Sequence, residues 1–137
     1  MENQNNLIKR IEDLENNKQD KTQDSGWQNL TLINGWAHYS GQNVPQYRKI
    51  GKVVYIHGCI RVLETTDTSN RNIAQLPQGF RPSGITNNLY FAQELINGSS
   101  TREIKDIQIT TSGIIMAPGN TQQGQWFPLD GISFPVD

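Results

Sequence analysis

Cysteine is almost absent from this sequence. Cys59 is the only one among 137 residues, so no disulfide forms within the chain. Stability therefore has to come from packing or from association with other chains. Because Cys59 lies within a β-type pattern, we expect a buried structural thiol rather than a reactive one.

The chain also has no large excess of positive or negative charge and no long apolar run. The formal net charge is -1, so the chain offers no basic field to nucleic acid or to an anionic membrane surface. Nowhere are there about 18 consecutive apolar residues, and Met1 is not followed by a basic leader and an apolar run. We expect a chain that binds no nucleic acid, inserts into no membrane and has no signal peptide.

Motifs of catalysis and metal binding are missing as well. His38 and His57 are the only histidines, and neither has Cys, Asp or Glu at the spacing of metal ligands. No phosphate-binding loop, nucleophile elbow or helical zinc motif occurs. The sequence therefore predicts no metal, no cofactor and no enzyme.

Two pairs of acidic residues leave one catalytic alternative open. Glu64 with Asp67 and Glu103 with Asp106 supply carboxylates, and a glycosidase needs two of them about 5 to 10 Å apart. Surface charge in turns explains these residues more simply. A polysaccharide-cleaving enzyme is accordingly the less favoured alternative.

The residues that are abundant favour a β protein. Apolar residues make up 34% and charged residues 18% of the chain, both low values, and Asn, Gln, Ser, Thr and Gly make up the difference. This balance is typical of extracellular or virion β proteins with many turns.

Residues 3–22 are the one stretch with a helical pattern. Leu7, Ile11 and Leu14 recur at spacings of four and three, which is a short heptad seam. A helix this short is marginal in water, so the seam has to be buried, either on the chain's own β region or against copies of itself. We favour self-association of a coiled-coil segment over residues 1–24, because the seam is narrow.

Residues 25–137 are predicted to form a β domain organised around the run Tyr47–Val62, interpreted as a central strand with a tight bend or bulge at Ile50-Gly51-Lys52. Side chains at alternate positions form two faces of this strand, and the face with Tyr55 and His57 is mixed in polarity. Gly58 weakens the strand unless another segment approaches closely there. One face is uniformly apolar and should point into a core: Val54, Ile56, Ile60 and Val62.

Turn residues divide the rest of this domain into short strands. Asn34-Gly35 predicts a β-hairpin with a return strand at 36–39, and Asn97-Gly98 predicts a second hairpin between strands 89–96 and 102–110. Further strands are predicted at 114–117 and 125–134. About seven or eight short strands without β-α-β alternation predict an antiparallel β-sandwich or barrel.

The β region resembles the C-terminal head domains of tail fibre and receptor-binding proteins from phages and prophages of Gram-positive bacteria. The residues that carry this resemblance are Trp27–Val62 with Trp-x-x-Leu-x-Leu-x-Asn-Gly-Trp, then Leu76-Pro-Gln-Gly-Phe-Arg-Pro, 109–116 and 126–134. The resemblance implies a homotrimer of β heads on a coiled-coil stalk, located at the virion tail tip together with other tail proteins. It also implies binding of a host cell-wall saccharide or teichoic acid without catalysis. A structural fibre module that binds only protein is the alternative.

Candidate ligand residues lie on or beside the predicted loops 40–46, 64–72 and 118–125. Flat aromatic rings cover the apolar face of a sugar, and Arg can grip phosphate bidentately. If Trp36 and Tyr39 are packing residues instead, the charged groups only keep the loops soluble. The predicted stacking or hydrogen-bonding groups are Trp36, His38 and Tyr39, and those for hydroxyls or phosphate are Arg61, Glu64, Asp67 and Arg71.

Overall fold

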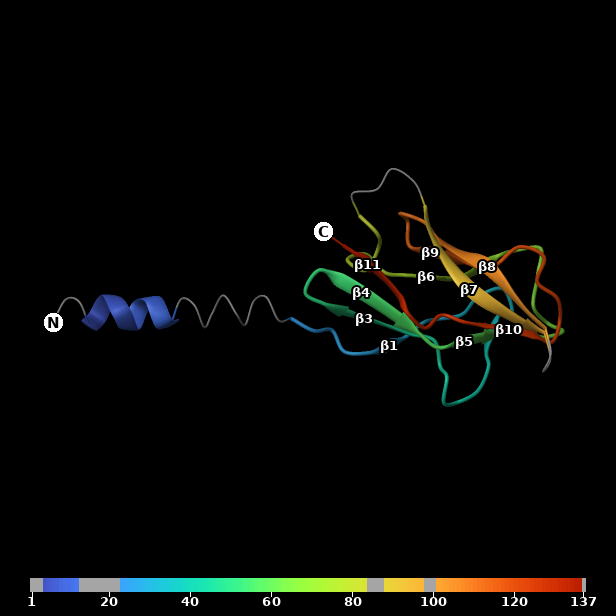
Figure 1. The fold of residues 1–137 in the computed structure, drawn as a ribbon, viewed down its shortest axis with the longest axis horizontal. Coiled ribbons are helices and arrows are strands. Elements are labelled where there is room, and N and C mark those ends of the chain that lie inside the picture. The colour runs from blue at the N-terminus through green and yellow to red at the C-terminus, as the bar shows by residue number, and fades with distance from the viewer. Residues whose placement is uncertain (1–3, 13–22, 84–87, 98–100, 137) are drawn as a thin grey trace.

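The computed structural model describes residues 4–12, 23–83, 88–97 and 101–136. A helix over residues 4–12 precedes two antiparallel β-sheets (Figure 1). The strands of the described residues are β1 (Gln28–Asn29), β2 (Ala37–His38), β3 (Gln46–Ile50), β4 (Val53–His57), β5 (Cys59–Arg61), β6 (Asn72–Gln75), β7 (Leu89–Asn97), β8 (Thr101–Ile109), β9 (Ile114–Met116), β10 (Gln125–Pro128) and β11 (Ile132–Pro135).

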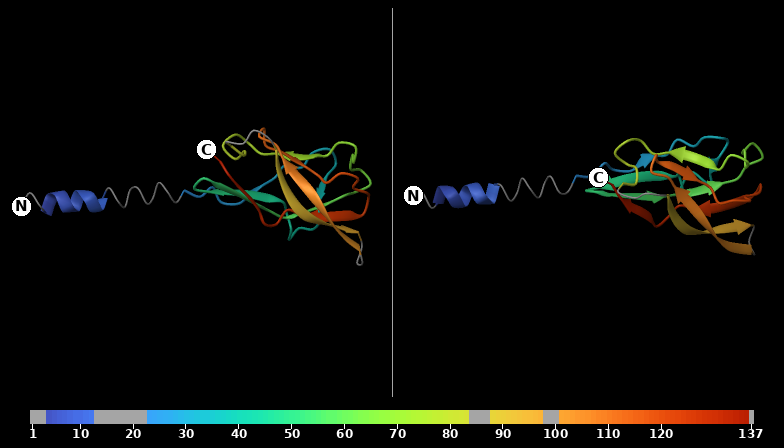
Figure 2. Two further views of the ribbon diagram at one scale, coloured as in Figure 1. Left: turned by 45° about the horizontal axis from the view of Figure 1, so that its top comes forward. Right: turned by 90° about the horizontal axis from the view of Figure 1, so that it is seen from above.

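The helix lies away from the β region in every view (Figures 1 and 2). Its apolar side chains are exposed, Leu7 to 58%, Ile8 to 55% and Ile11 to 49%. The predicted helix is therefore present at 4–12, and the described residues of the chain do not bury its seam. Leu14, the third seam residue, lies outside the described residues. No helix among the described residues is long and apolar enough to cross a membrane.

Two sheets enclose one core. A four-stranded sheet has the order β1-β3-β4-β11, and a seven-stranded sheet has the order β2-β5-β10-β7-β8-β9-β6. The predicted apolar face is confirmed, because Val54, Ile56, Ile60 and Val62 are all at most 2% exposed. These residues join Phe127 in a single buried cluster that draws on both sheets. The chain is thus mainly β, with curled antiparallel sheets.

The predicted bend at Gly51 is confirmed, but the run Tyr47–Val62 forms three strands and not one central strand. Gly51, with φ 59°, turns β3 into β4. Gly58, with φ 118°, then carries the chain from β4 in the four-stranded sheet to β5 in the seven-stranded sheet. A Cβ at Gly58 would lie 2.4 Å from Cα of Pro45, which is the close approach that a glycine in a strand suggests.

The predicted final strand 125–134 is divided in the same way. β10 ends at Pro128 in the seven-stranded sheet, and β11 begins at Ile132 in the four-stranded sheet. Between them, Gly131 has φ 85°. Both sheets are therefore joined at two neighbouring corners.

The predicted hairpin at Asn34-Gly35 is also corrected. The turn is present, with φ 58° at Asn34 and 76° at Gly35, but β1 before it pairs with β3 and β2 after it pairs with β5. The turn thus links two sheets instead of two paired strands. By contrast, β7 and β8 form the second predicted hairpin, with Leu89 opposite Ile109 and Asn97 opposite Thr101.

Residues 23–26 are docked on β3 as an edge segment, which we call the strap. Ser25 N donates to Lys49 O at 2.9 Å, and Gly51 N donates to Gln23 O at 2.8 Å. Asp24 pairs with Ile50, and Gln28 pairs with Tyr47. The chain therefore advances by four residues on this edge while β3 advances by three. The extra residue is a β-bulge at Gly26, whose φ is 70°. From the sequence alone, the polar residues 22–26 are predicted to be a breaker that connects the helix to the β domain. Residues 23–26 are instead part of the sheet edge.

Candidate functional site

The outer face of the four-stranded sheet carries a row of polar and aromatic side chains. Strand pairing sets Arg48 opposite Tyr55, and Tyr55 opposite Ser133. Because side chains alternate along a strand, these residues share one face and the buried residues Ile56 and Ile132 share the other. The same face holds His57, opposite Gln46. Three strands, β3, β4 and β11, thus contribute to one surface.

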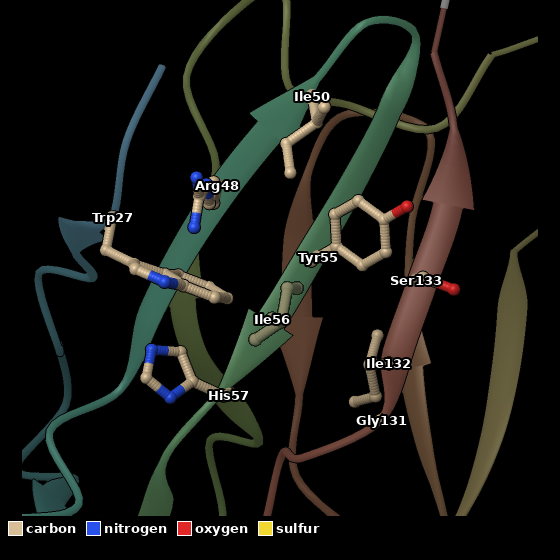
Figure 3. A pocket seen from close by; sticks show the side chains of 9 residues that line it. All are labelled: Trp27, Arg48, Ile50, Tyr55, Ile56, His57, Gly131, Ile132 and Ser133. Carbon is tan, nitrogen blue, oxygen red and sulfur yellow. The ribbon is translucent and has the colours of Figure 1, made fainter. Parts of the chain in front are cut away.

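A pocket of about 480 Å³ opens on this outer face (Figure 3). This volume lies in the range of small-molecule sites in proteins, about 300 to 1,000 Å³. Trp27, Ile50 and Tyr55 are each exposed to about 40%. The lining residues are Trp27, Arg48, Ile50, Tyr55, Ile56, His57, Gly131, Ile132 and Ser133.

Trp27 and His57 form one wall of the pocket. Their ring centroids are 3.9 Å apart at an angle of 56°. Nε2 of His57 lies 3.0 Å from Oε1 of Gln46, whose Nε2 donates to Oδ1 of Asn29 at 2.7 Å. An amide oxygen only accepts, so Nε2 of His57 carries the hydrogen of this bond and the ring orientation is fixed.

Arg48 lies beside Trp27 and is paired with the strap. Its guanidinium carbon is 5.7 Å from the Trp27 ring centroid, a cation–π distance. Nε donates to Oδ1 of Asp24 at 2.8 Å, and a terminal nitrogen donates to Oδ2. This bidentate bond, followed by the bond from Gly26 N, lowers the pKa of Asp24 to about 2, and Asp24 raises the pKa of Arg48.

The pocket combines aromatic surface with hydrogen-bonding side chains. Trp27 and Tyr55 present partly exposed rings, while Ser133, His57 and Arg48 supply hydrogen-bonding groups around them. Among the residues that the structure describes, no three His, Cys, Asp or Glu side chains gather as ligands for a metal ion.

Trp36, one of the predicted ligand residues, is buried. Only 4% of it is exposed, its Nε1 donates to Asn70 O at 3.1 Å, and its ring packs edge-on against Phe127. The ring therefore has no free face for a sugar, and its surroundings fit the packing interpretation left open above.

Tyr39 and Arg61, also predicted, do lie together. The Arg61 guanidinium carbon is 5.9 Å from the Tyr39 ring centroid, and that ring is 4.9 Å from the Trp126 ring. We call Tyr39, Arg61 and Trp126 the Tyr39 patch; it lies on the outer face of β5 and β10. His38 is exposed beside it, with Nδ1 3.1 Å from Ser40 O.

The remaining predicted residues are not drawn into one site. Arg71 donates from Nε to Ala117 O at 2.8 Å, which fastens its loop to the segment after β9. Asp67 accepts from the backbone and hydroxyl of Ser69 in its own turn. Glu64 is exposed in a turn.

Sequence reasoning missed the pocket. Tyr55 and His57 were visible at alternate positions of the mixed face, and that alternation was the available signal. Trp27, Arg48 and Ser133 come from other strands, and only strand order places them beside these two residues.

Two solved structures that are similar to this chain come from phages of Gram-positive bacteria. The receptor-binding protein gp15 of Listeria phage PSA has a TM-score of 0.70 at 19% identity, over 98% of this chain and 77% of its own. The head domain of the receptor-binding protein of lactococcal phage bIL170 has a TM-score of 0.53 at 18% identity, over 81% of this chain and 97% of its own. These are structural neighbours of the kind that the sequence resemblance implied. No protein-family model and no curated protein matches the chain.

Proposed function

We propose that this chain is the receptor-binding head of a phage tail and binds a saccharide of the bacterial cell surface without catalysis. The observation that carries this proposal is the pocket between Trp27 and Tyr55 on an exposed sheet face. The fold shared with two phage receptor-binding structures supports it. The location that follows is the virion tail tip, in contact with other tail proteins.

The pocket has the groups that a sugar ring needs. A pyranose has an apolar face of C–H groups, which packs on an aromatic ring, and a rim of hydroxyls, which form hydrogen bonds. Trp27 and Tyr55 supply the rings, and Figure 3 shows His57 beside Trp27 and Ser133 beside Tyr55 on the same face. Partly exposed aromatic residues are typical anchors of binding surfaces.

Trimerisation through the N-terminal helix belongs to this proposal. Leu7 and Ile11 are spaced as in a heptad and are exposed in the single chain. Burying them against two other copies removes apolar surface from water. Three heads on one stalk would then raise a weak affinity per site through effective concentration.

The direct test is binding to purified cell walls from a panel of Gram-positive bacteria. Trp27→Ala and Tyr55→Ala should each weaken binding about 30-fold, since loss of an aromatic anchor costs about 2 kcal/mol. Tyr90→Ala is the matched control, because Tyr90 is 62% exposed on the β7–β8 hairpin and does not line the pocket.

Two results would change this conclusion. If Tyr39→Ala and Arg61→Ala abolish binding while the pocket variants bind normally, the site is the Tyr39 patch. If the native protein binds none of the walls at any concentration, the receptor-binding function itself is refuted.

A structural module that binds only protein is the second candidate. The observation in its favour is a pair of exposed apolar side chains on the β7–β8 hairpin, Tyr90 at 62% and Ile104 at 69%. An excess of the isolated protein distinguishes the two functions, because an adhesin blocks adsorption of its phage and a purely structural module does not. Release of reducing ends from wall polymer would instead indicate a cleaving enzyme.

A further inference from the structure

The pocket contains a cation whose charge is already compensated. Among the residues that the structure describes, Arg48 is the only Arg or Lys in its lining, and no Asp or Glu lines it. The compensating carboxylate is Asp24, which reaches Arg48 from the strap. A pocket with a free arginine attracts anions, whereas one with a paired arginine does not.

We propose that Asp24 sets the specificity of this pocket by occupying the anion-binding edge of Arg48, so that the pocket prefers an uncharged saccharide to one bearing phosphate or carboxylate. This inference rests on the proposed function and names the ligand class of the same site. Asp24 acts through Arg48, and it is a positioning and specificity residue.

The geometry of the pair explains the exclusion of anions. A guanidinium grips a phosphate or carboxylate through two parallel N–H groups. Arg48 uses Nε and one terminal nitrogen in this way for the two oxygens of Asp24. An external anion has to displace Asp24 or accept a poorer geometry. The N–H groups that Asp24 leaves unused can still donate to neutral hydroxyls.

The strap holds the carboxylate at this position. Gly26 N donates to Oδ1 of Asp24 at 2.9 Å, and Asp24 itself bridges to Ile50 of β3. Lys49 N donates to Oγ of Ser25 at 2.9 Å, which fixes the next residue as well. An internal carboxylate held beside its partner acts at a high effective concentration, about millimolar or more. Since the pKa of Asp24 is about 2, it stays ionised at neutral pH.

The surrounding residues are consistent with a neutral ligand. The rings of Trp27 and Tyr55 lie on either side of Arg48 on the sheet face (Figure 3), and they offer apolar surface rather than charge. Ser133 contributes a hydroxyl that donates or accepts. These groups suit the C–H face and the hydroxyl rim of an uncharged sugar.

The test is titration of the native protein and Asp24→Asn with three probes: inorganic phosphate, glycerol 1-phosphate and the neutral methyl glycoside of N-acetylglucosamine. NMR shifts of the Arg48 Nε–H and the Trp27 indole report binding at the pocket. Asp24→Asn keeps a side-chain oxygen for Gly26 N and removes the charge. Asp106→Asn makes the same change of net charge at an exposed position that does not line the pocket.

We expect Asp24→Asn to bind both phosphate probes at least about tenfold more tightly than the native protein, with an affinity that falls as salt rises. Asp106→Asn should behave as the native protein does. In the double variant Asp24→Asn, Arg48→Gln, the gain in affinity for the phosphate probes should disappear. That result would assign the gain to Arg48. Melting temperatures measured in parallel show whether each variant is folded.

The inference is overturned if the native protein binds the phosphate probes as tightly as Asp24→Asn, or if a folded Asp24→Asn gains nothing. If Asp24→Asn does not fold, Asp24→Ser, which also lacks the charge, is titrated in its place. The same gain in phosphate affinity is then required of it. Failure of the proposed function looks different: the native protein then binds no bacterial wall, whatever the phosphate titrations show.

Discussion

The backbone nitrogen of Gly58 donates to Oδ1 of Asp130 at 2.9 Å. Each residue lies where its chain segment leaves one sheet for the other, and Leu129 N donates back to Gly58 O at 2.8 Å. The two corners of the fold are therefore fastened to each other. His57 of the pocket immediately precedes one corner and Gly131 of the pocket immediately follows the other.

Gly58→Ala should destabilise the head severely. The new Cβ would lie 2.4 Å from Cα of Pro45, which is backbone and cannot rotate away, and φ at this position is 118°. We expect a loss of about 3 kcal/mol or more in the free energy of unfolding, measured by urea denaturation. Gly41→Ala is the control, since a Cβ there meets nothing within 4 Å. Equal stability of the two variants would contradict the close packing at Pro45.

Cys59 should be unreactive in the folded protein and should make stability depend on alkaline pH. It is 5% exposed, and burial first, then the charge of Asp130, raises its pKa to about 11. Between pH about 9 and about 11 the unfolded chain loses the thiol proton while the folded chain keeps it, so stability falls as pH rises. Thiol reagents at pH 8 should label Cys59 only in denaturant.

The control for this dependence is Cys59→Ala. Its melting temperature should fall less steeply than that of the native protein across the same pH range, since the remaining titrating groups are unchanged. Parallel curves for the two proteins would show that the thiol does not contribute.

Two truncations should distinguish the contribution of the helix to self-association from the contribution of the strap to the stability of the head. Removal of residues 1–22 should abolish self-association in analytical ultracentrifugation and leave the melting temperature of the head nearly unchanged. Removal of residues 1–25 also deletes the Ser25–Lys49 and Asp24–Arg48 bonds. Because a backbone hydrogen bond contributes about 1 kcal/mol, this second truncation should lower the melting temperature by about 5 °C.

Single substitutions in the seam sharpen that test. Leu7→Asp and Ile11→Asp put a charge where apolar contact between copies is expected, and they should yield monomers with a normally folded head. Lys9→Asp, at a position outside the seam, is the matched control. A monomeric native protein would refute the stalk.

Thr66 should be a structural residue of its loop. It is 8% exposed, its Oγ1 donates to Gly35 O at 2.7 Å and accepts from Leu63 N at 2.8 Å. Thr66→Val keeps the shape and leaves both backbone groups without this partner, so we expect a loss of about 2 kcal/mol in denaturant unfolding. Thr68→Val, in an exposed part of the same loop, should cost little. A similar cost for both would show that Oγ1 of Thr66 is dispensable.

The sequence was informative wherever structure depends on local alternation. The buried face of Val54, Ile56, Ile60 and Val62 follows from a period of two alone. The β7–β8 hairpin follows from two such runs around Asn97-Gly98. These features need no knowledge of which strands lie side by side.

The break at Gly58 was not visible, because the alternation of buried residues continues in phase across it. Ile56 and Ile60 are both buried although Gly58 between them takes the chain into another sheet. The positive φ at Gly58 is tied to the approach of Pro45, a contact between strands. A single sequence contains no local signal of such a contact.

The candidate site was hidden for the same physical reason. The order β1-β3-β4-β11 brings Ser133, near the end of the chain, beside Tyr55, and Trp27 beside Arg48. From the sequence alone, Asp24 lies at the end of the predicted segment 1–24, in the polar breaker 22–26. The sequence does not place it on the sheet edge, because the bulge that docks it on β3 depends on pairing with Ile50. Of the predicted residues, Tyr39 and Arg61 do lie in contact. They meet because β2, which Tyr39 follows, pairs with β5, which contains Arg61.

The β3–β4 turn holds both ends of the head. Gly51 N donates to Gln23 O on the entering side, and Val136 N donates to Lys52 O on the leaving side, each at 2.8 Å. Figure 1 shows the last strand running back toward the helix. A fluorescent protein or affinity tag fused after this strand would therefore emerge beside the strap and leave the opposite end of the head clear. A circular permutant that joins these two ends through a short linker should fold, with new termini placed in a distal loop.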